Sequence, residues 1–118
     1  MYSLARARSI IRKSDFLPEE VVVGAEDFRD MTEDEINISK EVGTFPCVIL
    51  RAALDDNPAI LASFLLTLAN GYNSYYEKSR VLENNRLLYP HRLLVTAAVA
   101  GVLSNGLKLC HAEAPEIN

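Results

Sequence analysis

The sequence predicts an all-α fold, an antiparallel bundle of about five helices that form one domain over residues 1–118. Two observations predict this class. Apolar residues recur at spacings of three and four in several stretches, which is the period of an α-helix. Proline, or a residue that caps helices, stands where each later stretch begins. Because no β-hairpin pattern is evident, we expect no sheet.

The first helix is expected over residues 2–13, because its apolar residues recur with helical spacing. The apolar residues expected on one face of this helix are Leu4, Ala7 and Ile11. Residues 14–31 are then expected to form one long loop. Pro18 and Gly24 interrupt this segment, and it has no helical period.

The second helix is expected over residues 33–42, because Thr32 and Glu35 have the spacing of a capping box. Gly43 is suited to end it. The three consecutive acids at 33–35 could be taken for a metal site. Acids in a first turn favour the helix dipole, and we interpret them in that way.

Two further helices are expected, one that Phe45 and Pro46 start and that Asp55 and Asp56 end, and one over about residues 58–82. Pro46 suits the first helical position of the former, and Asn57 and Pro58 suit the cap and first position of the latter. The expected buried stripe of the first consists of Cys47, Leu50, Ala53 and Leu54. That of the second consists of Leu61, Leu65, Leu68, Tyr72, Tyr75, Ser79 and Leu82.

The last helix is expected over residues 90–110, with Pro90 at its first position. Residues 83–88 are expected to connect it to the helix before. Residues 112–118 contain Pro115 and are expected to form a surface tail.

Charge is distributed unevenly along the chain, whose formal net charge is −4. Residues 1–13 carry four bases and no acid, a net +4. Residues 14–42 carry ten acids and two bases, a net −8. A polyanion would therefore meet the first helix and avoid the acidic segment. Solvated faces without any partner would give the same pattern, so charge alone does not decide the function.

The sequence offers no catalytic, metal or cofactor site. His91 and His111 are far apart, with no nucleophile at a recognised spacing, and the glycines form no phosphate loop. Cys47 and Cys110 fit no metal spacing, and we expect buried, reduced cysteines in a cytoplasmic protein. No apolar run reaches the roughly 18 residues of a membrane span, so we expect no membrane contact.

Three motifs follow one another in the chain. Residues 2–13 read YSLARARSIIRK. Residues 68–76 read LANGYNSYY, with RVL at 80–82. The last helix contains VLSNGL at 102–107, and APE follows at 114–116. In this order they resemble the C-terminal DALR anticodon-binding domain of arginyl-tRNA synthetases, over nearly the whole chain.

The resemblance implies binding to the anticodon loop of arginine tRNA, with the catalytic domain of the same synthetase as a second partner. It implies no cofactor in this chain, because ATP and arginine belong to that catalytic domain, which is absent. At matching positions, the implied tRNA-binding residues of the long helix are Asn73, Tyr76 and Arg80, which share one face. Those of the first helix are Tyr2 and Arg6.

The chain departs from the family pattern at four positions. Leu4 is found where the family has a histidine, and His111 where it has a glycine. Ile117 and Asn118 are found where the family has an arginine and a methionine. The changed tail and the acidic segment leave a second hypothesis open, a freestanding helical protein-interaction module that kept the fold.

Overall fold

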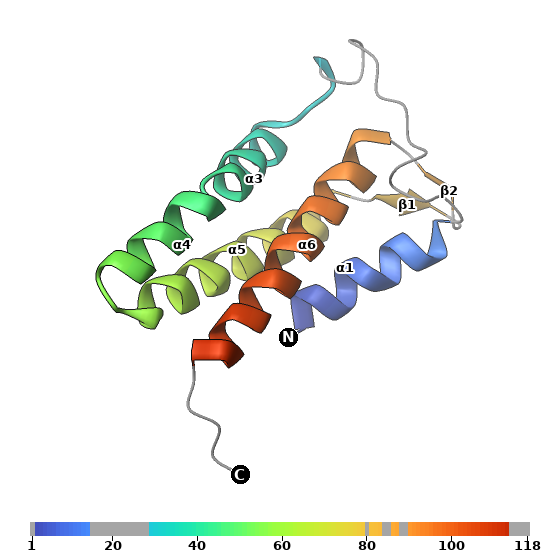
Figure 1. Cartoon of the computed structure of the whole chain (residues 1–118). Helices are drawn as coiled ribbons and strands as arrows, with labels where there is room; N and C mark the ends of the chain where they lie inside the picture. Colours follow the sequence, from blue (N-terminus) through green and yellow to red (C-terminus); the bar gives the residue numbers. More distant parts are fainter. Residues whose placement is uncertain (1, 15–28, 80, 84–85, 88–89, 114–118) are drawn as a thin grey trace.

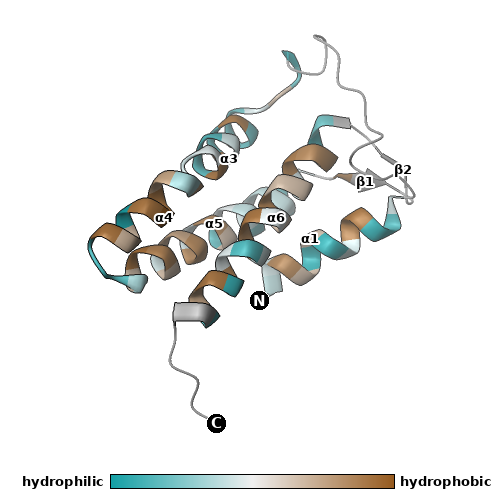
Figure 2. Cartoon of the chain, in the orientation of Figure 1, coloured by the Kyte–Doolittle hydropathy of each residue, from teal (hydrophilic) through white to brown (hydrophobic). Residues whose placement is uncertain are grey.

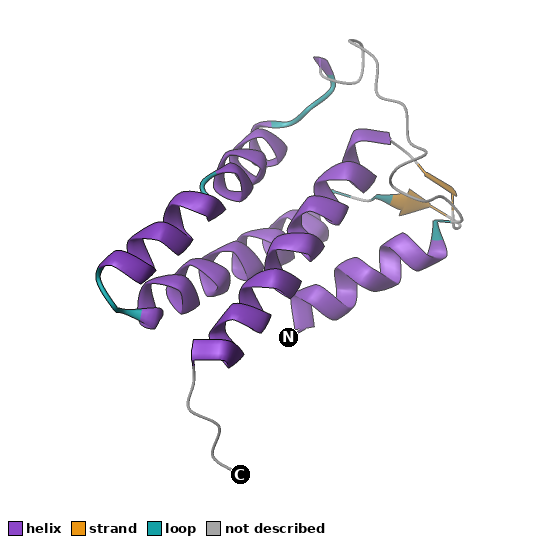
Figure 3. Cartoon of the chain, viewed as in Figure 1, coloured by secondary structure: helices purple, strands orange, loops and turns teal. Residues whose placement is uncertain are grey.

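The computed structural model describes residues 2–14, 29–79, 81–83, 86–87 and 90–113. Its helices are α1 (Tyr2–Lys13), α3 (Glu33–Gly43), α4 (Phe45–Leu54), α5 (Pro58–Lys78) and α6 (Pro90–Glu113). Two short strands, β1 (Leu82–Glu83) and β2 (Arg86–Leu87), lie between α5 and α6. Figure 3 shows how far helices dominate the fold. The expected all-α class is confirmed.

Helix α6 lies at the centre of the bundle and packs against α1, α3 and α5. Figure 1 shows α6 between α1 on one side and the successive helices α3 and α4 on the other, with α5 behind. The start of α1 also contacts the second half of α5, where Ser3 bonds to Ala69.

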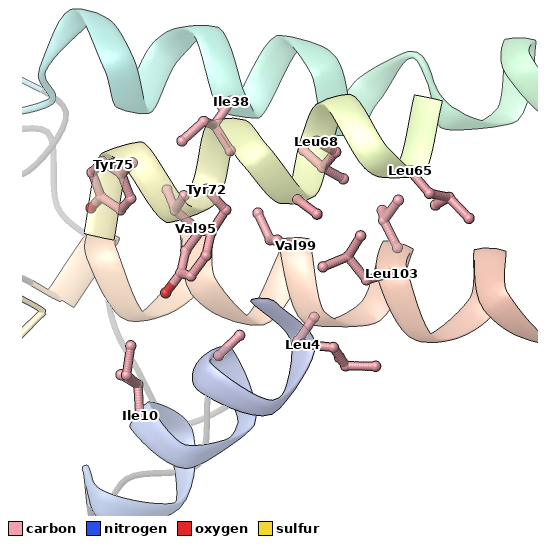
Figure 4. Close-up of a cluster of buried hydrophobic side chains, with 14 of the residues drawn as sticks. Leu4, Ile10, Ile38, Leu65, Leu68, Tyr72, Tyr75, Val95, Val99 and Leu103 are labelled. Atoms are coloured by element: carbon pink, nitrogen blue, oxygen red, sulfur yellow. The ribbon is translucent and has the colours of Figure 1, made fainter. Parts of the chain in front are cut away.

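The core forms where α5 and α6 face one another (Figure 4). Tyr72 and Tyr75 of α5 are completely buried, which confirms their expected place on the core stripe. The Tyr72 hydroxyl lies 3.0 Å from Thr96 Oγ1 of α6, so this buried polar atom is satisfied. Burial raises the pKa of Tyr72 to about 12. The other core residues labelled in Figure 4 are Leu4, Ile10, Ile38, Leu65, Leu68, Val95, Val99 and Leu103.

The length and composition of α6 alone would allow it to cross a membrane, over His91–His111. The expectation that no stretch reaches this size was therefore wrong. Figure 2 shows apolar residues along much of this helix and on α4. Leu93, Val99 and Leu103 are completely buried, because α6 has neighbouring helices on three sides.

The connection between α5 and α6 differs from expectation. Helix α5 ends at Lys78 rather than near residue 82, because Ser79 adopts an extended conformation. Strands β1 and β2 then pair antiparallel, so the expectation of no sheet was wrong. Strands of two residues are too short for alternation to be visible in a sequence. The apolar Leu82 continued the helical spacing by coincidence.

Other boundaries lie close to the expected ones. Helix α6 continues to Glu113, so the expected tail begins two residues later than residue 112. The remaining tail, residues 114–118, lies outside the described residues. Most of the expected loop also lies outside them, over residues 15–28.

The buried face of α4 was predicted wrongly. Leu50 and Leu54 are 59% and 74% exposed, and Cys47 and Ala53 are exposed as well. The residues that pack inward are Phe45, Val48, Ile49 and Ala52. Apolar residues occur on every side of this short helix, so their spacing does not select a face. The rotation of α4 is set instead by tertiary packing, including the stacked rings of Phe45 and Phe64, 6.0 Å apart.

The expected burial of both cysteines was also wrong. Cys47 is exposed and Cys110 is half-buried, and both are free thiols. Cys47 is exposed because it lies on the outward face of α4, beside the two exposed leucines.

The capping box at the start of α3 is confirmed. The Glu35 amide donates to Thr32 Oγ1 at 3.2 Å, and the Thr32 amide donates to Glu35 Oε1 at 2.8 Å. These reciprocal bonds satisfy two backbone donors of the first turn. Glu33 and Asp34 are exposed beside them, as acids in a first turn commonly are.

Glu35 also joins three helices, which the sequence did not indicate. Its side chain is completely buried. Oε2 accepts from the Tyr75 hydroxyl at 2.8 Å and from Arg92 Nε at 3.2 Å, and it lies 3.0 Å from His91 Nε2. We call Glu35, Tyr75, His91 and Arg92 the Glu35 joint, because they connect α3, α5 and α6.

Burial of the Glu35 carboxyl would by itself raise its pKa. The hydrogen bonds from the Thr32 amide and the Tyr75 hydroxyl, together with His91, outweigh that effect and hold the pKa of Glu35 below its ordinary value. The pKa of the Tyr75 hydroxyl is raised, by burial and by the carboxylate that it contacts. Both shifts favour an ionised Glu35 that accepts a hydrogen bond from a neutral tyrosine.

Candidate nucleic-acid interface

A buried hydrogen bond fixes the first turn of α1 on α5. Ser3 Oγ donates to the Ala69 carbonyl at 3.0 Å, and Leu4 and Ala7 are buried beside it. Tyr2 and Arg6 are four residues apart and therefore share the neighbouring face of α1. That face meets α5 one turn beyond Ala69.

Arg6 is the centre of the resulting cluster. Its guanidinium carbon lies 4.5 Å from the centroid of the Tyr2 ring and 4.1 Å from that of the Tyr76 ring. Nη1 donates to Asn73 Oδ1 at 3.3 Å, and Nη2 donates to the Tyr2 hydroxyl. We call Tyr2, Arg6, Asn73 and Tyr76 the Arg6 cluster.

The Arg6 cluster is open to solvent. Tyr2 is 67% exposed and Tyr76 is 37% exposed, whereas Arg6 and Asn73 are half-buried. Cation–π contacts of this kind favour an ordered guanidinium and ordered rings. The cluster thus presents aromatic surface and polar groups in fixed positions, which is the chemistry used to hold unpaired bases.

Four of the five predicted site residues lie in this cluster. The sequence placed them on two separate helix faces, and the structure brings the two faces together. The fifth, Arg80, lies outside the described residues. Nothing in the geometry tests whether any of them binds RNA, so their role stays a prediction.

Basic side chains extend from the cluster along α1. Arg8 is exposed and donates to Ser104 Oγ of α6 at 3.1 Å, and Arg12 and Lys13 are exposed further along the helix. The exposed acids Glu33 and Asp34 lie at the start of α3, and α6 separates α3 from α1 (Figure 1). The exposed bases of α1 and these two exposed acids of α3 are therefore on different sides of α6.

Sequence reasoning missed Ser3, which anchors α1, and the histidine and arginine of the Glu35 joint. Ser3 could have been found, because it shares a helical stripe with the buried residues Ala7 and Ile10. His91 and Arg92 had no such signal, since their partner Glu35 is more than 50 residues away in the chain. Within the described ranges, no three histidine, cysteine or acidic side chains are grouped closely enough to hold a metal ion.

The family described as the DALR anticodon binding domain matches residues 1–117. Arginine–tRNA ligases from the Streptococcus pneumoniae strains Hungary19A-6, 70585 and P1031 are each 39% identical to it over 115 residues. The alignments cover 98% of this chain and 20% of each ligase, so the chain spans about a fifth of the length of these relatives. No solved structure gives a significant match.

Proposed function

Because the chain belongs to the DALR anticodon-binding domain family, we propose that it binds the anticodon loop of an arginine-accepting tRNA. The observation that carries this proposal is the Arg6 cluster, in which Tyr2, Arg6, Asn73 and Tyr76 converge from two helices. Arg80 belongs to the same proposal through its place in the sequence motif.

The chemistry of the cluster suits an unpaired loop. Single-stranded RNA is bound by stacking of splayed bases on aromatic rings and by hydrogen bonds to their edges. Tyr2 and Tyr76 expose ring surface for stacking, and Asn73 can hydrogen-bond a base edge. The exposed bases Arg12 and Lys13 on α1 suit the phosphates of the loop.

Electrostatics also favour one orientation for the RNA. The net charge of the chain is −4, which would oppose a polyanion if it were spread evenly. The exposed bases of α1 lie on one side of α6 and the exposed acids of α3 on the other. An approaching tRNA would therefore be steered toward α1.

The proposal extends to the protein in which this chain works. The relatives are named arginine–tRNA ligases and are about five times as long. We infer that aminoacylation, with its ATP and arginine, belongs to a catalytic domain that acts together with this one. The chain itself would supply tRNA binding in the cytoplasm and no catalytic group.

One observation favours a second candidate, a protein-interaction module. The outward face of α4 exposes Leu50 and Leu54, together with Cys47. Exposed apolar side chains that lie together on one face often mark a protein contact. This face would equally serve contact with a catalytic domain, so it does not displace the first candidate.

The deciding experiment is binding of this chain to arginine tRNA and to the same tRNA with a replaced anticodon loop, over a range of salt concentrations. Anticodon-loop binding predicts tighter binding to the native loop that persists at moderate salt. Equal and steeply salt-dependent binding to both RNAs would indicate charge attraction alone and would contradict the proposal. Leu50→Ser with Leu54→Ser is the matched surface control, which should leave tRNA binding unchanged.

A further inference from the structure

Resting on the proposed function, we propose that Arg6 acts as a positioning residue that orients the Asn73 amide. In that orientation the Asn73 NH₂ group donates to a ring nitrogen or carbonyl of an unpaired base stacked beside Tyr76. The ligand class is therefore a base that presents hydrogen-bond acceptors. Arg6 itself would not be a phosphate contact.

The orientation of Asn73 follows from the chemistry of arginine. A guanidinium carries five N–H donors and no acceptor. The atom of Asn73 that meets Arg6 Nη1 at 3.3 Å must therefore be the amide oxygen. Within the part of the chain that the structure describes, the amide nitrogen of Asn73 donates to no protein atom. Its two N–H groups are available to a ligand.

The contacts of Arg6 explain why it holds Asn73 rather than a phosphate. Its planar group faces the rings of Tyr2 and Tyr76, and it donates to two neighbouring side chains. Each contact would be disturbed if the group turned toward the RNA backbone. Arg12 and Lys13 are exposed on the same helix and reach solvent freely. They suit phosphates better.

The cluster as a whole presents donors. The Tyr2 hydroxyl oxygen accepts from Arg6, which leaves its own hydrogen to donate outward. The Arg6 guanidinium covers part of the Tyr76 ring, so a base would stack on the surface of Tyr76 that stays exposed. A base in that position meets the N–H groups of Asn73 through its acceptor atoms.

The first test is Asn73→Asp. Aspartate offers oxygen atoms only, so it keeps Arg6 in place and even strengthens that contact, but it removes the outward donor. We expect binding to arginine tRNA to weaken about tenfold, because one hydrogen bond to the base is lost and a carboxylate oxygen then faces an acceptor atom of the base. The matched control is Asn70→Asp, which adds the same charge at an exposed position one turn earlier on α5.

The second test separates positioning from phosphate contact at Arg6. Arg6→Lys keeps the charge but loses the planar fork that reaches both rings and the Asn73 oxygen. Positioning predicts weaker binding with an unchanged slope of log affinity against log salt. Arg6→Gln should likewise weaken binding while changing the slope by much less than one unit. A phosphate contact would give the reverse, near-normal binding for the lysine variant and a slope lower by about one unit for the glutamine variant.

The outcomes keep the two proposals distinct. If Asn73→Asp binds as tightly as Asn70→Asp while the wild-type chain still prefers the native loop, the Asn73 inference is wrong and anticodon binding stands. If the wild-type chain does not distinguish the two tRNAs, both proposals fail together. Circular dichroism and thermal unfolding of each variant establish that it is folded before its affinity is compared.

Discussion

Tyr75 and Tyr76 are consecutive residues of α5, yet they belong to two contrasting polar clusters. The Tyr75 hydroxyl donates to the buried carboxylate of Glu35, in a joint that is mostly buried. The Tyr76 ring lies under the guanidinium of Arg6, in a cluster open to solvent. Each cluster has a charged side chain at its centre with tyrosine beside it. The difference is whether hydrogen-bonding groups are left for a ligand.

The two clusters therefore serve different purposes. In the Glu35 joint, Oε1 accepts from a backbone amide and Oε2 meets three side chains, so both carboxylate oxygens are occupied. Such a joint fixes how α3, α5 and α6 sit together. In the Arg6 cluster, ring surface and the Asn73 amide nitrogen stay accessible. Stability should depend on the first cluster and RNA binding on the second.

The largest expected effect is on stability. Glu35→Ala leaves Arg92 and His91 without their buried carboxylate and should lower the free energy of unfolding by about 3–5 kcal/mol. Arg6→Ala, in the open cluster, should cost less than about 1 kcal/mol. Urea unfolding followed by circular dichroism measures both. If both variants lost the same unfolding free energy, the two clusters would contribute equally to stability and the contrast between them would be wrong.

The next effect is on binding. Tyr76→Ala should weaken binding to arginine tRNA by about 1–3 kcal/mol, the range for stacking of one base. Its unfolding free energy should change little, because the side chain is more than a third exposed. The neighbouring variant Tyr75→Phe should show the opposite pattern, with lower stability and normal affinity. Fluorescence titration and urea unfolding of both variants test this reversal, and normal affinity of folded Tyr76→Ala would remove Tyr76 from the site.

A smaller effect should appear in acid. The pKa of Glu35 is lower in the folded chain than its ordinary value of 4.5 in an unfolded one. Its contribution to stability is therefore complete above about pH 4.5 and is lost as the pH falls through the folded pKa. The difference in unfolding free energy between wild type and Glu35→Gln should shrink over that interval. The groups that face the carboxylate are Tyr75, His91 and Arg92. If the difference in unfolding free energy between the two proteins did not change with pH, the lowered pKa of Glu35 would be contradicted.

Local features of the fold could be predicted from the sequence. The capping box of Thr32 and Glu35 and the core stripe through Tyr72 and Tyr75 depend on residues three or four apart on a single helix. The same spacing paired Tyr2 with Arg6. Such patterns depend only on residues close together in the sequence, so they can be recognised without a structure.

Features that depend on tertiary packing could not be predicted in the same way. The meeting of Arg6 with Asn73 joins residues 67 positions apart, and that of Glu35 with Arg92 joins residues 57 apart. The buried face of α4 was not predicted because the helix has apolar residues on every side. No local pattern selects a face in that case, and the contact with Phe64 does.

The bond between Ser3 and Ala69 has a consequence for motion. The first turn of a helix lacks some of its internal hydrogen bonds and opens readily, yet in α1 this turn carries Tyr2. The hydroxyl of Ser3 ties that turn to the interior at Ala69. Opening of the helix end should therefore be suppressed at the residues that form the cluster. The amides of the second turn of α1 donate to the carbonyls of the first turn, so their hydrogen exchange would then be slower than near an ordinary helix end, and Ser3→Ala would restore fast exchange.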